Sequence, residues 1–151
     1  MPMPKSVTKV SRDGSVTFTS NVDRVNYSIR ELSRKALFDI AKYIRRLMII
    51  ELKKLPGMKK HKRIYNSTQY WVRRRENDLQ IGFKHNAWYG VQQELGDRNQ
   101  PKRSILRDTV YKNIDQIRII TGKYLSAVED ENRALGLINE EDYNSEGKMD
   151  E

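Results

Sequence analysis

The sequence predicts an α+β fold in which two long helices pack on a small antiparallel sheet. Two stretches have apolar residues at three- and four-residue steps, as one face of a helix requires. Two other stretches combine β-branched and aromatic residues on both sides of a short polar turn, which is typical of hairpins. Leu, Ile, Val and Phe together make up about 24 % of the chain, above the level of disordered proteins, so a thin core is expected.

A β-hairpin is predicted at the N-terminus, over about residues 5–20. Valine and threonine alternate with polar residues on both sides of Asp13-Gly14, and both of these turn residues tolerate a positive φ. A hairpin of two strands is only marginally stable in water by itself. We therefore expect this hairpin to rest on another part of the protein.

The first long helix is predicted over about residues 29–55. Ser28 and Glu31 have the spacing of a capping box, and apolar residues then recur at helical steps as far as Leu52. Pro56-Gly57 ends the helix, because a residue that precedes proline avoids the helical conformation. A helix of this length is about 40 Å long, more than a compact domain of this size needs.

The remaining elements are a second hairpin over about residues 69–84 and a second long helix over about residues 104–131. The apolar stretch around residues 88–95, between them, fits a strand or a helix, and Gly96 ends it. Residues 1–138 are predicted to form a single α+β domain. Residues 139–151 are rich in acids and are predicted to be a disordered, flexible tail.

Charge is unevenly distributed along the chain. The whole chain carries +9, but residues 139–151 contain six acids and one lysine and carry −5, so the preceding residues carry +14. A body this basic usually faces a polyanion or an acidic protein. Two basic runs interleaved with aromatic residues are the candidate contacts, although the arginines could equally solvate an outer face; the runs are Lys59, Lys60, Lys62, Arg63, Arg73, Arg74 and Arg75.

The pattern contains no signal for catalysis, a metal or a cofactor, and we expect none of them. There is no cysteine, and the two histidines, His61 and His85, have no partner at ligand spacing. Glu94 and Asp97 could form a carboxylate pair, but capping a turn or meeting basic neighbours explains them better. Phosphate-binding glycine loops, nucleophile elbows and zinc-protease motifs do not occur, nor does an apolar stretch of about 20 residues that would cross a membrane.

One stretch is more specific than composition. An aromatic-rich segment at residues 88–96 is followed by a polar loop with Pro101 and by the start of a long helix. This arrangement resembles the head–tail joining, or tail-completion, proteins of long-tailed bacteriophages, and the likeness spans about residues 28–128. The positions that match the family pattern, in which an aromatic strand end precedes the loop, are Tyr89, Glu94, Gly96, Leu106 and Arg107. The departures are Ser104 in place of the usual Pro, Ile105 in place of Phe and Thr109 in place of Ala.

The resemblance implies a structural virion protein that performs no reaction. It would form a ring with copies of itself in the neck, between head-side neck or portal-associated proteins and the tail tube or tail-terminator protein. Double-stranded DNA would pass through the ring and touch it non-specifically, and the protein would be assembled in the bacterial host cytoplasm. Gly96 would permit a turn. Glu94 would accept hydrogen bonds from loop amides or an arginine, or equally be a simple surface acid. A small basic nucleic-acid-binding protein is the alternative that the charge leaves open.

Overall fold

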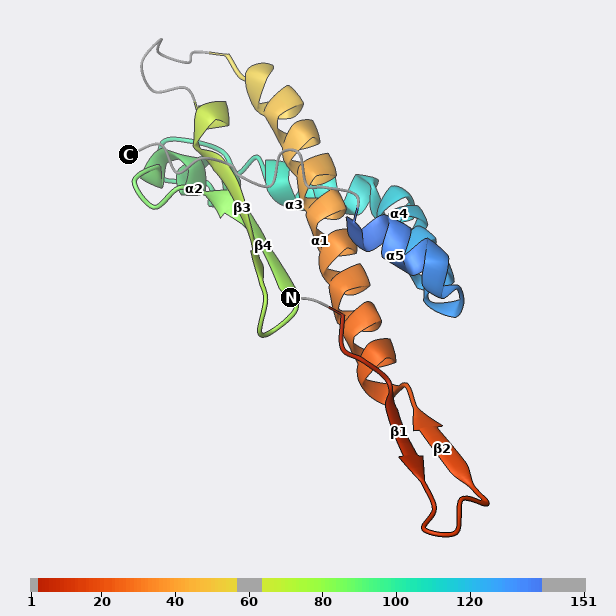
Figure 1. Cartoon of the computed structure of the whole chain (residues 1–151). Helices are drawn as coiled ribbons and strands as arrows, with labels where there is room; N and C mark the ends of the chain where they lie inside the picture. The colour runs from red at the N-terminus through yellow and green to blue at the C-terminus, as the bar shows by residue number, and fades with distance from the viewer. Residues whose placement is uncertain (1–2, 57–63, 140–151) are drawn as a thin grey trace. The chain divides into compact units, whose positions relative to one another are not determined.

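The computed structural model describes residues 3–56 and 64–139, which belong to two compact units (Figure 1). The first unit comprises Met1–Lys35 and Lys123–Glu151, and the second comprises Ala36–Gly122. In chain order the elements are β1 (Val7–Val10), β2 (Thr17–Ser20), α1 (Val22–Lys53), a 3-10 turn (Ile64–Ser67), β3 (Thr68–Arg73), β4 (Asp78–Phe83), α2 (Trp88–Leu95), α3 (Ile105–Lys112), α4 (Ile114–Ser126), a second 3-10 turn (Ala127–Glu129) and α5 (Glu131–Asn139). The predicted α+β class, with an N-terminal hairpin, is confirmed.

The prediction of two long helices on one sheet is wrong for the described residues. They form five α-helices, and the strands form two separate two-stranded sheets, β1–β2 and β3–β4. The predicted second helix divides at Asn113, whose side-chain amide donates to the carbonyl of Thr109 at 2.8 Å. Asparagine favours such local bonds to the backbone, which compete with the regular helical pattern. The Asn113 side chain also accepts from the Tyr43 hydroxyl at 3.0 Å.

A second interruption separates α4 from α5. Asp130 has extended backbone angles, and its carboxylate accepts from the amide of Asn132 at 2.9 Å. An aspartate in this position satisfies an otherwise unpaired donor of the following helix, so α5 begins anew at Glu131. Asn139 ends this helix, so it belongs to α5 rather than to the predicted tail. The other tail residues, 140–151, lie outside the described residues, and the single domain over 1–138 stays a prediction.

Helix α1 begins seven residues earlier than predicted. The first helical bond in this region joins the amide of Val25 to the carbonyl of Asn21 at 3.0 Å, and Asp23 places a negative charge in the first turn. Carboxylates near a helix N-terminus stabilise it. Ser28 therefore lies inside the helix, and its capping-box spacing with Glu31 does not mark the start. The predicted end near residue 55 is close, because α1 ends at Lys53.

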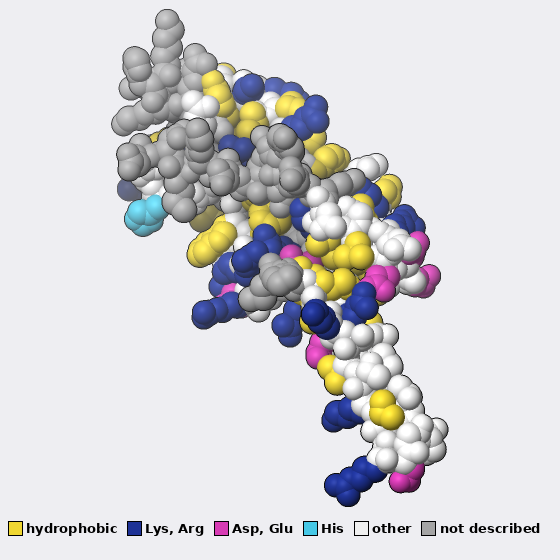
Figure 2. Space-filling view, in the orientation of Figure 1, with side chains coloured by type: hydrophobic (Ala, Val, Ile, Leu, Met, Phe, Trp, Pro, Cys, Tyr) yellow, Lys and Arg dark blue, Asp and Glu magenta, His cyan; other side chains and the backbone are white. Residues whose placement is uncertain are grey.

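The first unit contains the predicted N-terminal hairpin, whose strands pair from Val7 with Ser20 to Val10 with Thr17. Gly14 alone supplies a positive φ (+70°) in its turn. Nearly all side chains of both strands are exposed, so within the described residues the hairpin does not rest on a core as expected. Figure 2 shows isolated hydrophobic side chains on this part of the surface. The unit's buried residues are instead helical: Leu32, Tyr124, Ala127, Ala134 and Leu137.

The second unit contains the second hairpin, which matches its predicted position. Strand β3 pairs with β4 from Thr68 with Phe83 to Arg73 with Asp78. The inner face carries Val72, which is 6 % exposed, and Tyr70, whose ring meets Phe38 of α1 edge to face at 6.4 Å. One face of α1 completes this core with Ala41, Ile44, Met48 and Leu52.

Candidate functional site

The residues that carry the family resemblance lie in one segment of the second unit, residues 88–107, which we call the α2 clasp. It consists of α2, the loop after it and the first turn of α3. The structure forms a helix at residues 88–95, where the family pattern implies the end of a strand. Its backbone approaches β4 closely: a Cβ on Gly90 would lie 2.6 Å from the ring of Phe83. Glycine is therefore needed at this position for the helix to pack there.

Gly96 ends α2 and turns the chain toward α3. Its φ is +83°, and a Cβ there would lie 2.9 Å from the backbone nitrogen of Lys102. The loop then returns to α2, because the amide of Arg103 donates to the carbonyl of Gln93 at 3.0 Å. The amide of Ser104 donates to the carbonyl of Glu94 at 3.3 Å. The end of α2 and the start of α3 are thus held together through the backbone.

The side chain of Glu94 caps α3 from another element. Its two carboxylate oxygens accept from the amides of Leu106, at 2.9 Å, and Arg107, at 3.0 Å. Ser104, the residue before α3, has a left-handed conformation and its side chain does not cap the helix. The first amides of a helix have no partner within it, and a carboxylate is favoured there by charge. Glu94 therefore supplies acceptors that the local sequence does not.

The residues of the family motif make different contacts in the α2 clasp. The Glu94 carboxylate accepts from two amides in the first turn of α3, those of Leu106 and Arg107, rather than from the loop amides or the arginine that were expected. The Arg107 side chain instead contacts neighbouring Asp108 at 3.4 Å. Tyr89 is half-buried, and its ring meets Trp88 edge to face at 6.2 Å. Both carboxylate oxygens of Glu94 accept from amides of α3, whereas the Asp97 carboxylate accepts from the amide of Arg98 at 2.6 Å and from the side-chain amide of Gln92 at 3.3 Å.

The opposite side of α2 carries a row of exposed apolar side chains, which belong to the apolar stretch that the sequence indicated at residues 88–95. Trp88, Val91 and Leu95 are 64 %, 51 % and 66 % exposed and follow steps of three and four residues; we call them the α2 stripe. The same spacing usually marks the face that a helix turns to the core. Here Gln93 and Glu94, on the polar side, are the residues tied to the loop and α3. The helical spacing of these three residues is the signal in the sequence that could have identified the stripe.

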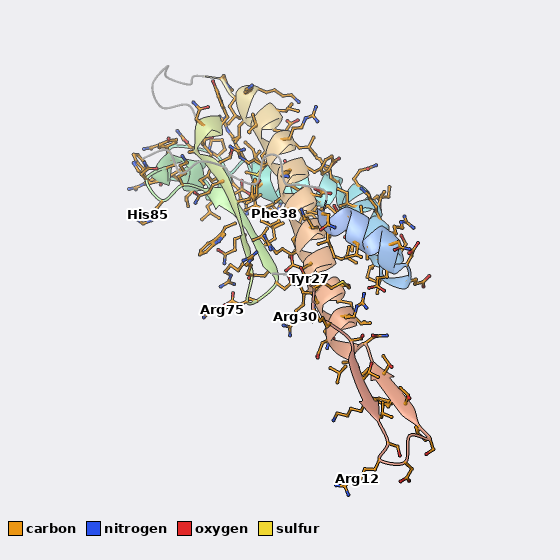
Figure 3. All side chains as sticks on the ribbon, in the orientation of Figure 1. Arg12, Tyr27, Arg30, Phe38, Arg75 and His85 are labelled. Carbon is orange, nitrogen blue, oxygen red and sulfur yellow. The ribbon has the colours of Figure 1, made fainter. Side chains whose placement is uncertain are left out.

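The predicted basic residues are not all in one place. Lys59, Lys60, Lys62 and Arg63 lie outside the described residues. Arg73 is paired with Glu76 and Asp78, and this pairing raises the pKa of Arg73 and lowers that of Asp78. Arg74 and Arg75 are exposed at the turn between β3 and β4, where Figure 3 labels Arg75. Of this run, Arg74 and Arg75 present their charge to solvent.

A shallow cavity of about 220 Å³ lies between α1 and α3 in the second unit. Its charged lining residues are Glu51, Arg103, Asp108 and Lys112, so both signs are represented. No group of three or more metal-ligating side chains occurs in residues 3–56 and 64–139. His85 is exposed after β4, and His61 lies outside the described part of the chain.

Comparisons with known proteins assign no family to the chain. Within the described residues, no helix is both long and apolar enough to cross a membrane. A scan of protein-family models, a search of curated proteins and a search of solved structures each gave no match.

Proposed function

We propose that the chain is a structural virion protein of a long-tailed bacteriophage. It completes the head-proximal end of the tail and joins it to the DNA-filled head, as part of a ring in the neck through which DNA passes. The α2 clasp is the observation that supports this proposal. Three of the five residues that carry the resemblance, Glu94, Leu106 and Arg107, are joined by two hydrogen bonds, and Gly96 makes the turn between them.

The α2 stripe supports a role in assembly. Contiguous exposed apolar residues commonly mark protein–protein contacts, and an apolar helix face fits a groove on a partner. The α2 clasp fixes the short helix that carries this face. Gly90 packs against Phe83 near the start of the helix, and backbone hydrogen bonds hold its end. A second copy of the chain in a ring, the head-side neck or portal-associated proteins and the tail tube or tail-terminator protein are the partners of this proposal. A ring requires two different surfaces on each copy, of which the stripe would be one.

Electron microscopy of phage made without the protein tests this function. We expect tails with defective or unjoined ends, and DNA-filled heads that lack tails. Infectious particles of normal appearance would contradict the proposal. The position of the gene offers a simpler check, since neighbouring reading frames should encode a portal, a capsid protein and a tail tube.

Complementation with variants tests the surface itself. A chain with Trp88→Ser, Val91→Ser and Leu95→Ser should fold but fail to restore joined particles. Ile119→Ser is the matched control, because Ile119 is also a strongly exposed apolar residue on a helix of the second unit. Full complementation by the stripe variant would exclude the α2 stripe as an essential contact. Circular dichroism of both variants shows whether they are folded.

A further inference from the structure

A second exposed tryptophan lies in different surroundings. Trp71 of β3 is 65 % exposed and lies on the outer face of the β3–β4 hairpin, opposite Gln80. The next pair on this face is Gln69 with Gly82. A Cβ on Gly82 would meet nothing within 4 Å, so the surface beside the indole is open. We call Gln69, Trp71, Gln80 and Gly82, with Arg74 and Arg75 at the turn, the ribbon face.

The charges around the ribbon face favour an anionic ligand. The nearest acids, Asp78 and Glu76, are both paired with Arg73, and Arg73 Nε donates to Asp78 Oδ1 at 2.7 Å. Arg73 thus compensates one of the two carboxylate charges, and the three residues together carry −1. Arg74 and Arg75 form no ion pair with any residue that the structure describes. The turn thus carries a net charge of +1, with its two carboxylates held against Arg73 and with Arg74 and Arg75 unpaired among the described residues.

We propose that the ribbon face binds single-stranded nucleic acid. The indole of Trp71 stacks on an unpaired base, and Arg74 and Arg75 pair with the flanking phosphates. The amides of Gln69 and Gln80 can donate to or accept from the edge of that base, or meet the sugar. A duplex does not fit as well, because its bases are already stacked on one another and present only their edges.

The composition of the ribbon face distinguishes this ligand from a protein partner. Trp71 is the only large apolar side chain among the outward-facing residues of β3 and β4; the others are two glutamines, a glycine and the Arg73–Asp78 ion pair. Binding hot spots between proteins usually lie at the centre of a well-packed, desolvated cluster. The α2 stripe, with three neighbouring apolar residues, has that composition. The inference does not depend on the function proposed above.

The test uses the full-length protein and fluorescently labelled oligothymidylate and oligouridylate of about 20 nucleotides, a length above the site size of common single-strand binders. Fluorescence anisotropy at low salt should detect binding to one or both strands. Trp71→Ala should weaken it about tenfold, as expected when one base loses its stacking partner. Tyr111→Ala is the matched control, because Tyr111 is an equally exposed aromatic residue (67 %) that lies on α3, and it should leave the affinity unchanged.

The salt dependence tests the arginines separately. Replacing Arg74 and Arg75 with Gln should lower the slope of log affinity against log salt by about 1.4, if each contacts one phosphate of a single strand. Absence of binding at low salt would overturn the proposal. So would equal losses in Trp71→Ala and Tyr111→Ala, or tighter binding of a duplex that is insensitive to Trp71→Ala. The proposal would also be contradicted by a protein partner that binds through Trp71 and is not displaced by nucleic acid. Circular dichroism checks that each variant is folded.

Discussion

The two hairpins of this protein have similar local sequences but different surroundings. Strands β1 and β2 carry valines, threonines and Phe18, and nearly every side chain on them is exposed, Phe18 to 63 %. Strands β3 and β4 have an inner face that is largely covered, with Thr68 and Val72 buried. The amide-to-carbonyl pairing is antiparallel in both. Pairing alone therefore does not determine which hairpin belongs to a core.

The difference indicates where each hairpin obtains its stability. The second hairpin contributes apolar area to the core of its own unit, and Arg45 of α1 donates to the Thr68 carbonyl at 3.2 Å. In the first hairpin, the side-chain bond between Thr8 and Thr19 is exposed and long, at 3.4 Å. Such a bond adds little in water. Substitutions should thus be costly in the second hairpin and nearly neutral in the first.

The largest effect is expected from placing a charge on each hairpin in turn. Val72→Asp should lower the free energy of unfolding by about 3 kcal/mol or more, because it buries an unpaired polar group. Val10→Asp is the matched variant, since Val10 is also a strand valine but is 60 % exposed. It should change the free energy by less than about 0.5 kcal/mol. Urea denaturation followed by circular dichroism measures both, and equal losses would show that the first hairpin is also covered.

A smaller loss is expected when the α2 clasp loses its carboxylate. Glu94→Ala removes the acceptors of the Leu106 and Arg107 amides and should cost about 2 kcal/mol, as for hydrogen bonds to a charged group. The exposed acid Glu129, in the first unit, provides the control, and Glu129→Ala should be close to neutral. Denaturation curves compare the two. If Glu94→Ala is as neutral as the control, the capping bonds add no net stability.

Among the described residues, two glycines have a positive φ, Gly14 and Gly96, and they extend the comparison to the backbone. Gly96→Ala should cost about 1–2 kcal/mol, because the new Cβ is strained by its φ and must also displace Lys102. Gly14→Ala, in the turn of the first hairpin, meets only open space and should cost less. Thermal denaturation ranks the two variants. A larger loss for Gly14→Ala would mean that the first hairpin is essential to the fold.

The smallest effect on stability is expected from lowering the pH. Pairing with Arg73 lowers the pKa of Asp78 below its ordinary value of 3.8, so this pair stabilises the folded state above about pH 3.8. The contribution declines as the pH falls further, through the lowered pKa. Asp78→Asn should therefore make stability less dependent on pH in this range than it is in the unchanged protein. Denaturation curves between pH 2 and pH 5 would reveal the difference, and identical profiles would contradict it.

Local patterns predicted the elements whose signals are local. Both hairpins were predicted because turn residues and alternation act over a few neighbours, and the end of α1 followed from Pro56. The start of α1 was wrong because Ser28 and Glu31 have cap spacing within a helix that continues through them. The break at Asn113 was not predicted, because the apolar residues keep their helical spacing on both sides of it. The side-chain bond from Asn113 to the Thr109 carbonyl, which competes with the regular helical pattern, leaves no trace in that spacing.

The candidate site was only partly predictable. Glu94 was identified through the resemblance, with loop amides or an arginine as its expected partners and a simple surface acid as the alternative. Its partners, Leu106 and Arg107, are twelve and thirteen residues away, and only the folded loop brings them within hydrogen-bond distance. The exposure of Trp88, Val91 and Leu95 was not predicted, since an apolar face at helical spacing normally faces a core.

By itself, the sequence determined the class of the fold, the positions of both hairpins and an excess of positive charge, because these depend on composition and short-range periodicity. The tertiary structure decided which hairpin has a buried face and which side of α2 forms hydrogen bonds with the loop and α3. It also decided that Arg74 and Arg75 have no acidic partner among the described residues. Each of these depends on atoms from distant positions in the chain. Burial and hydrogen bonding are properties of such contacts, so an identical local pattern can be core in one place and surface in another.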